Sequence, residues 1–130
     1  MRAVLLYLSR LKWLRRFMER SRLARPLVMR FVAGDSLSEA LATCRGMHGE
    51  GIRTTLDYLG ENVRSREEAA AVRDAYLDLT GRLKGCPGEA SVSIKLTQFG
   101  LDLSDELCLE NVDALVRKAK EHGVRVEIDM

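Results

Sequence analysis

The sequence lacks the closely spaced cysteine pairs that mark zinc-binding and redox domains. Its three cysteines, Cys44, Cys86 and Cys108, lie far apart, and no two of them form a C-x-x-C motif. Structural zinc sites and redox dithiols normally need such a pair. The pattern therefore argues against both kinds of site, and it predicts buried or inert thiols in a reducing compartment.

Long apolar runs are also missing. No stretch of 18 consecutive apolar residues occurs, so the sequence predicts no transmembrane helix. Residues 1–8 begin like a signal peptide, but Arg10 and Lys12 interrupt the apolar segment early, and no small-residue cleavage site follows. We therefore expect a cytoplasmic protein.

Familiar catalytic and nucleotide-binding motifs are absent as well. Neither G-x-G-x-x-G nor G-x-x-x-x-G-K-[ST] occurs, so any nucleotide cofactor must be held without a Rossmann or P-loop device. No Ser-His-Asp arrangement and no cluster of metal ligands is visible in the sequence, and we expect no metal site. The two histidines, His48 and His122, fall near predicted helix ends, where a solvated imidazole complements the helix dipole.

Charge is divided unevenly along the chain. Residues 1–30 contain nine Lys/Arg and one acid, a net +8, which leaves −6 for residues 31–130 because the whole chain carries +2. Apolar and arginine side chains alternate at helical spacing over residues 4–22, which predicts a basic amphipathic helix. Pro26 interrupts it, and residues 27–32 form a short second segment. Such an arm, which we assign to residues 1–33, could meet an anionic membrane surface, nucleic acid or an acidic face of the same protein.

Residues 34–130 alternate between predicted helices and strands. The strands are expected at 52–58, 91–97 and 124–129. Helices are expected to begin at Ser36, Ser65 and Ser104, because a serine hydroxyl accepts a hydrogen bond from a free amide of the first turn. Ser36 and Ser65 are each followed three residues later by glutamate, which completes a capping box. This order of elements is typical of βα units in a parallel sheet or barrel.

Each predicted helix has an apolar stripe that should be buried, and Gly123 should end the third helix. The stripes are Leu37, Ala40, Leu41, Cys44 and Met47; Ala69, Val72, Tyr76, Leu79 and Leu83; and Leu109, Val112, Leu115, Val116 and Ala119.

The predicted strands have one apolar and one polar face. The apolar positions are Leu56, Val92, Ile94, Val124, Val126 and Ile128, and the polar positions are Arg53, Thr55, Asp57, Ser93, Lys95, Arg125, Glu127 and Asp129. Strands of doubly wound sheets are covered by helices on both faces and read mostly apolar. We therefore expect an α/β fold, an incomplete (βα)8 TIM-like barrel made of its first three strands and preceded by N-terminal helices. A two-layer, half-open sheet is the competing interpretation. The chain is about half as long as a complete barrel, which needs ~250 residues.

Lys95 and Asp129 occupy equivalent positions near the carboxyl ends of the second and third predicted strands. Active-site groups of a βα barrel lie at that end. The lysine could bind a substrate carboxylate and the aspartate a substrate ammonium group, and desolvation would strengthen both interactions. A structural ion pair is the alternative. Glu61 falls in the loop after the first strand, either as a site residue or as a solvated carboxylate.

A series of segments carries a more specific signal. In chain order they are Arg30-Phe31-Val32-Ala33-Gly34, Thr55-Leu56-Asp57-Tyr58-Leu59-Gly60-Glu61, Ser93-Ile94-Lys95-Leu96-Thr97-Gln98 and Glu127-Ile128-Asp129-Met130. Together they resemble the FAD-dependent proline dehydrogenases, in particular the short monofunctional bacterial type.

The resemblance implies a barrel that binds FAD and oxidises L-proline to Δ¹-pyrroline-5-carboxylate, passing electrons to a membrane quinone. It implies that Lys95 contacts the substrate carboxylate and that Asp129 is the active-site aspartate. Met130 would line the flavin, and Glu61 would form an ion-pair gate with an arginine from a later strand. The arginines that clamp the proline carboxylate would also come from later strands.

We therefore expect residues 34–130 to be the N-terminal portion of such a barrel, inactive alone and prone to homo-oligomerise or aggregate. The arm should contact the inner face of the cell membrane peripherally, and no nucleic-acid partner is expected. The second hypothesis is a non-catalytic βα scaffold whose basic arm binds a membrane or a partner protein.

Overall fold

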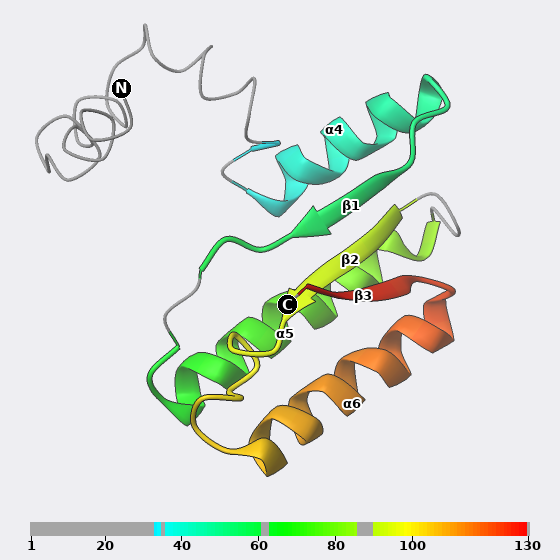
Figure 1. Ribbon diagram of the computed structural model, residues 1–130. Coiled ribbons are helices and arrows are strands. Elements are labelled where there is room, and N and C mark those ends of the chain that lie inside the picture. Colours follow the sequence, from blue (N-terminus) through cyan, green and yellow to red (C-terminus); the bar gives the residue numbers. More distant parts are fainter. Residues whose placement is uncertain (1–32, 35, 61–62, 86–89, 130) are drawn as a thin grey trace, which may run out of the picture.

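The computed structural model describes residues 33–34, 36–60, 63–85 and 90–129 (Figure 1). Their elements, in chain order, are α4 (Leu37–Gly49), β1 (Thr54–Asp57), α5 (Arg66–Arg82), the 3-10 helix η1 (Leu83–Gly85), β2 (Ala90–Lys95), α6 (Asp105–His122) and β3 (Arg125–Asp129). The predicted helices of the arm, Glu61 and Met130 lie outside the described residues.

The strands form one parallel sheet with the order β1-β2-β3, which confirms the predicted α/β class and the β-α-β-α-β order. Leu56, Val92 and Val126 are aligned across the three strands. The strands are shorter than the sequence suggests. β2 ends at Lys95 because the chain turns there, and the Gln98 amide donates a hydrogen bond to the Lys95 carbonyl at 3.0 Å.

Helix boundaries follow the capping residues. The hydroxyls of Ser36, Ser65 and Ser104 each accept a hydrogen bond from the amide three residues later, at 3.2–3.3 Å. Gly123 ends α6 in the left-handed region, with φ 69°. In a capping box the Glu68 carboxylate would accept from the amide of Ser65. In the structure it accepts from the Arg64 amide, one residue earlier, at 2.6 Å. All three predicted helix starts are therefore confirmed.

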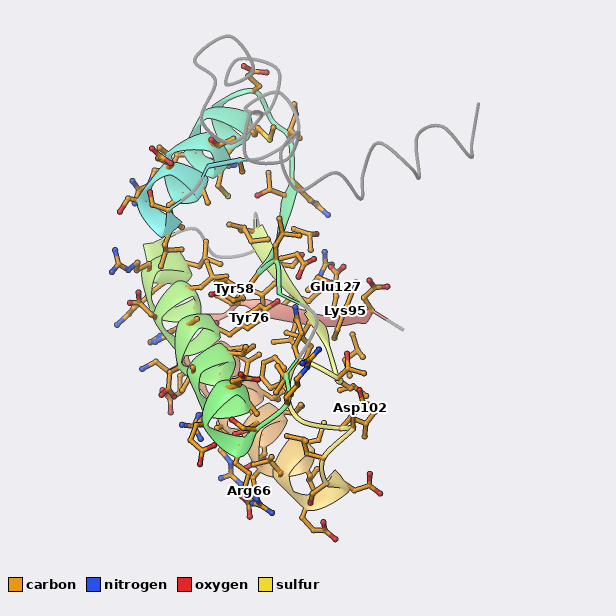
Figure 2. The ribbon with its side chains drawn as sticks, turned by 90° about the vertical axis from the view of Figure 1, so that its left-hand side faces the viewer. Tyr58, Arg66, Tyr76, Lys95, Asp102 and Glu127 are labelled. Atoms are coloured by element: carbon orange, nitrogen blue, oxygen red, sulfur yellow. The ribbon has the colours of Figure 1, made fainter. Side chains whose placement is uncertain are left out.

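Helices α5 and α6 cover one face of the sheet, and α4 lies along β1 (Figure 1). Val92 and Ile94 on β2 are fully buried beneath the helices. Figure 2 shows Lys95 and Glu127 on the opposite side of the sheet from α5. The described part of the chain is thus a helical layer on a sheet whose other face is polar. Three strands do not close a barrel, so the barrel stays an expectation.

Several apolar positions expected in the core are exposed instead. Leu109 and Val116 of α6 are 71% and 44% exposed, because α6 carries two apolar stripes and only one of them faces the sheet and α5. The buried stripe of α6 consists of Leu107, Cys108, Asn111, Leu115 and Ala119. Met47 is also exposed, since it lies in the last turn of α4, where the chain turns back toward β1. Ile128 is exposed because β3 has no neighbour on its outer edge among the described residues.

Two further features concern the cysteine thiols and the apolar length of the helices. Cys44 and Cys108 are buried and free, as predicted, whereas Cys86 lies outside the described residues. In the part of the chain that the structure describes, no helix is both long enough and apolar enough to cross a membrane.

Candidate active site at the carboxyl ends of the strands

Lys95 and Asp129 are the last residues of β2 and β3, and the sheet register pairs them. Register partners on parallel strands lie on the same face of a sheet, so both side chains belong to the polar face at its carboxyl edge. Lys95 is half-buried and Asp129 is exposed. The structure therefore brings together the two residues that the sequence singled out. Their chemical roles stay predictions.

A chain of polar contacts crosses the same face nearer the beginning of the strands. The hydroxyls of Thr55 and Ser91 lie 2.9 Å apart, and Ser91 Oγ donates to Glu127 Oε1 at 2.9 Å. Arg125 Nε donates to the same carboxylate oxygen at 3.1 Å. This network links all three strands, and its members Ser91 and Glu127 lie four residues before Lys95 and two residues before Asp129. Its contacts lie on the same face of the sheet as the register pair Lys95 and Asp129.

The hydroxyl of Tyr76 joins α5 to the carboxyl ends of β1 and β2. As a donor, the hydroxyl is within reach of Asp57 Oδ1 at 3.1 Å and of the Ser93 carbonyl oxygen at 2.7 Å. It also accepts a hydrogen bond from the Tyr58 amide at 3.1 Å. The ring is fully buried, and its centroid lies 5.4 Å from that of Phe99. Burial raises the pKa of Tyr76 far above its usual value, so the phenol stays neutral. Asp57 is aligned with Ser93, a polar-face position, and its carboxylate also accepts a hydrogen bond from this residue of the helical layer.

Gln98, in the turn after β2, is the second buried polar residue that contacts the segment following β1. Its Nε2 donates to the carbonyl oxygens of Tyr58 and Gly60, at 2.8 and 2.9 Å. Gln98 is 1% exposed, and Oε1 has no hydrogen-bond partner among the described residues. Both amide protons are thus used on one short segment of backbone.

The turn that carries Gln98 is closely packed against α5 and α6. Gly100 has φ +97°, and a Cβ there would lie 2.9 Å from Leu107 Cδ2. Asn111 Nδ2 donates to the Phe99 carbonyl at 3.1 Å, and Asn111 Oδ1 accepts from Arg73 Nη1 at 3.2 Å. The turn is therefore anchored to both helices, so the position of Gln98 is well defined.

Two of these polar residues were not recognised as site residues from the sequence. Tyr76 was predicted only as a core residue, although a buried tyrosine hydroxyl normally needs a hydrogen-bond partner, and that need was the available signal. Gln98 ends the Lys-Leu-Thr-Gln segment, but its sequence position does not reveal which backbone groups it reaches. Glu61 and Met130, the other two predicted site residues, lie outside the described residues.

Comparison of the sequence with known proteins identifies its family. The family model described as "Proline dehydrogenase" matches residues 40–130. "Proline dehydrogenase 1" of Bacillus subtilis strain 168 is 37% identical over 132 aligned residues, which cover all of this chain and 43% of that relative. "Proline dehydrogenase" of Deinococcus radiodurans is 32% identical over 107 residues, covering 80% of this chain and 34% of the relative. The chain thus spans less than half the length of these relatives.

Proposed function

The chain belongs to the proline dehydrogenase family, and from that membership we propose that it forms part of a site that oxidises L-proline to Δ¹-pyrroline-5-carboxylate. The observation that carries the proposal is the register pairing of Lys95 with Asp129 at the carboxyl edge of the sheet. The family match extends over both residues. Proline is a zwitterion, and this pair offers one group of each charge.

We assign the two residues opposite tasks in binding. The Lys95 ammonium group binds the proline carboxylate, a charge-assisted contact of the stronger kind. The Asp129 carboxylate holds the proline nitrogen, so that the ring is oriented between the two strands. Because Asp129 is exposed and Lys95 is half-buried in the described residues, the site needs further cover before water is excluded from it.

That cover is proposed to come from the rest of a (βα)8 barrel. The three strands and their helices have the alternating order and the single covered face of consecutive βα units. Later strands of such a barrel would supply the arginines that clamp the substrate carboxylate and the arginine that pairs with Glu61 over the site. On this proposal the present chain is inactive alone.

FAD is the proposed cofactor, and a quinone is the proposed final electron acceptor. When bound, the flavin accepts the hydride that proline loses. We place it on the polar face beside Lys95, because α5 and α6 cover the opposite face of the sheet (Figures 1 and 2). Met130 is proposed to line the flavin, and most other flavin contacts would come from later strands. We therefore expect this chain alone to bind FAD weakly.

Substitutions in a chain extended to the complete barrel test the assignment. Lys95→Ala and Asp129→Ala should each lower kcat/KM for proline by about 30- to 1000-fold, the loss typical of a charged substrate contact. Glu61→Ala should be milder, because a gate affects closure more than chemistry. His48→Ala is the control and should be near neutral, since His48 lies in the last turn of α4, away from the carboxyl edge.

The measurement is steady-state proline oxidation with an artificial electron acceptor. Near-normal kinetics for a folded, FAD-loaded Lys95→Ala protein would contradict the proposed binding mode. Absence of proline oxidation by the unsubstituted chain extended to the complete barrel would contradict the proposed function, and it would leave the non-catalytic scaffold as the better interpretation.

A further inference from the structure

The short segment from Asp57 to Gly60, which leads the chain out of β1, is held by two buried side chains. Tyr76 contacts the Asp57 carboxylate and the Tyr58 amide, and Gln98 donates to the carbonyl oxygens of Tyr58 and Gly60. Both the N–H and the C=O of Tyr58 are therefore bound by side chains from other elements. Figure 2 shows Tyr58 beside Tyr76, and their ring centroids lie 6.3 Å apart.

Apolar packing does not account for this arrangement. The side chains of Tyr58 and Leu59 are 49% and 78% exposed, so the segment buries little surface of its own. Gln98, by contrast, is completely enclosed, with Oε1 unpartnered among the described residues. Burying an amide with an unsatisfied oxygen opposes folding, and an apolar side chain would fill the same space without that cost. What Gln98 contributes is the placement of the Tyr58 and Gly60 carbonyls.

The held segment borders the candidate site. Asp57 is aligned with Ser93, and Lys95 follows two residues later on β2. Because β1 and β2 are parallel neighbours, the residues just after Asp57 leave the sheet at the level of Lys95. The turn that carries Gln98 begins directly after Lys95. The same turn therefore ends β2 and binds the backbone of the segment that follows β1.

We infer that Tyr76 and Gln98 are positioning residues that hold residues 57–60 as a fixed border of the proline site. This inference rests on the proposed function. A border that is already in place spares the ordering entropy that a loose segment would lose when substrate binds. Its loss should therefore raise KM for proline more than it lowers kcat.

Two conservative variants and one matched control test the inference. Gln98→Met keeps the length of the side chain and removes both donors. Tyr76→Phe removes only the hydroxyl and keeps the ring contact with Phe99. Thr80→Val is the control, because Thr80 is buried on the same helix and, among the described residues, its hydroxyl donates to the Tyr76 carbonyl within α5, at 2.7 Å.

The first measurement uses this 130-residue chain and needs no activity. Amide hydrogen exchange at Tyr58 should be at least about 10-fold faster in Tyr76→Phe, since the amide loses its acceptor, and unchanged in Thr80→Val. The second uses the chain extended to the complete barrel. There both positioning variants should raise KM for proline about 3- to 10-fold with a smaller change in kcat and with FAD content retained.

The outcomes separate this inference from the proposed function. Unchanged Tyr58 exchange in Tyr76→Phe would overturn the inference whether or not the enzyme is active. An active parent whose KM is unchanged in both variants would also overturn it. A parent without proline oxidation would overturn the proposed function instead, while accelerated exchange would still support the hold on residues 57–60. If Gln98→Met fails to fold, Tyr76→Phe decides both measurements.

Discussion

At the residue scale, Gly100 is a position where the backbone strongly favours glycine. Its φ of +97° disfavours any side chain, and a Cβ would meet Leu107 Cδ2 at 2.9 Å. We expect Gly100→Ala to lower the free energy of unfolding by about 2–4 kcal/mol, through backbone strain and displacement of Leu107. Urea denaturation measures the change.

The matched control for that substitution is Gly81→Ala. Gly81 lies within α5, and a Cβ there meets nothing within 4 Å. Alanine should stabilise the chain by about 0.5–1 kcal/mol, because glycine is the poorer helix former. Equal midpoints for the two variants would contradict the strain assigned to the turn after β2.

The burial of Cys108 can be tested by the rate at which its thiol is alkylated. Burial, with a smaller contribution from the Asp105 carboxylate, raises the pKa of the Cys108 thiol, so less thiolate is present at any given pH than in an unfolded chain. Alkylation of Cys108 at pH 8 should be much slower in the folded chain than in urea. Peptide mass mapping of iodoacetamide-treated protein identifies the site. Rates that match between the folded and the urea-unfolded chain would contradict the burial of this thiol.

At the element scale, the helix boundaries could be predicted from the sequence but the buried faces only in part. Ser104 and Gly123 cap the two ends of α6. Both caps could be predicted because capping depends on residues that are close in the sequence. The burial of α6 depends on which of its two apolar stripes faces α5 and the sheet. Leu109 and Leu115 are both leucines at plausible core positions, yet only Leu115 is buried. That choice belongs to tertiary packing, which no local pattern records.

The site shows the same division. Period-two alternation was enough to place Lys95 and Asp129 on one face, and the observed register confirms that they occupy equivalent positions near the carboxyl ends of their strands. The contacts of Gln98 join residues 38 and 40 positions apart, with α5, η1 and β2 between them. Such long-range contacts depend on the path of the chain between Gly60 and Gln98, so the sequence alone could not predict them.

The predicted membrane contact of the arm is based on its charge. Residues 1–30 carry a net +8, so we expect weak binding to anionic vesicles that is lost as salt is raised. Vesicle sedimentation compares the whole chain with a chain lacking residues 1–30, with neutral vesicles as the control. Equal binding of both chains to anionic vesicles would exclude the arm as the contact.

At the scale of the whole molecule, the described sheet has two open edges. β1 and β3 each have a neighbour on one side only, and strand edges are sites of self-association. Leu109 and Val116 add exposed apolar surface on α6. We therefore expect the isolated chain to be marginally stable and to self-associate.

Paired substitutions on α6 test that expectation. Leu109→Gln with Val116→Gln should reduce self-association, because both remove exposed apolar surface without touching the buried stripe. Glu110→Gln with Lys120→Gln is the control, since both residues are exposed polar positions on the same helix and the net charge is unchanged. Sedimentation velocity over a range of concentrations gives the result. A parent chain that stays monomeric throughout would refute the expectation.

The strand order also has a consequence for how the chain reaches this structure. β1 and β3 both pair with β2 and never with each other, and the hydroxyl contacts that link them, Thr55 to Ser91 and Ser91 to Glu127, each span 36 residues. Two loops of equal length have nearly the same closure entropy, so chain statistics favour neither pairing. Synthesis removes that symmetry, because β1 and β2 leave the ribosome before β3. We therefore expect β2 to pair first with β1 and then with β3.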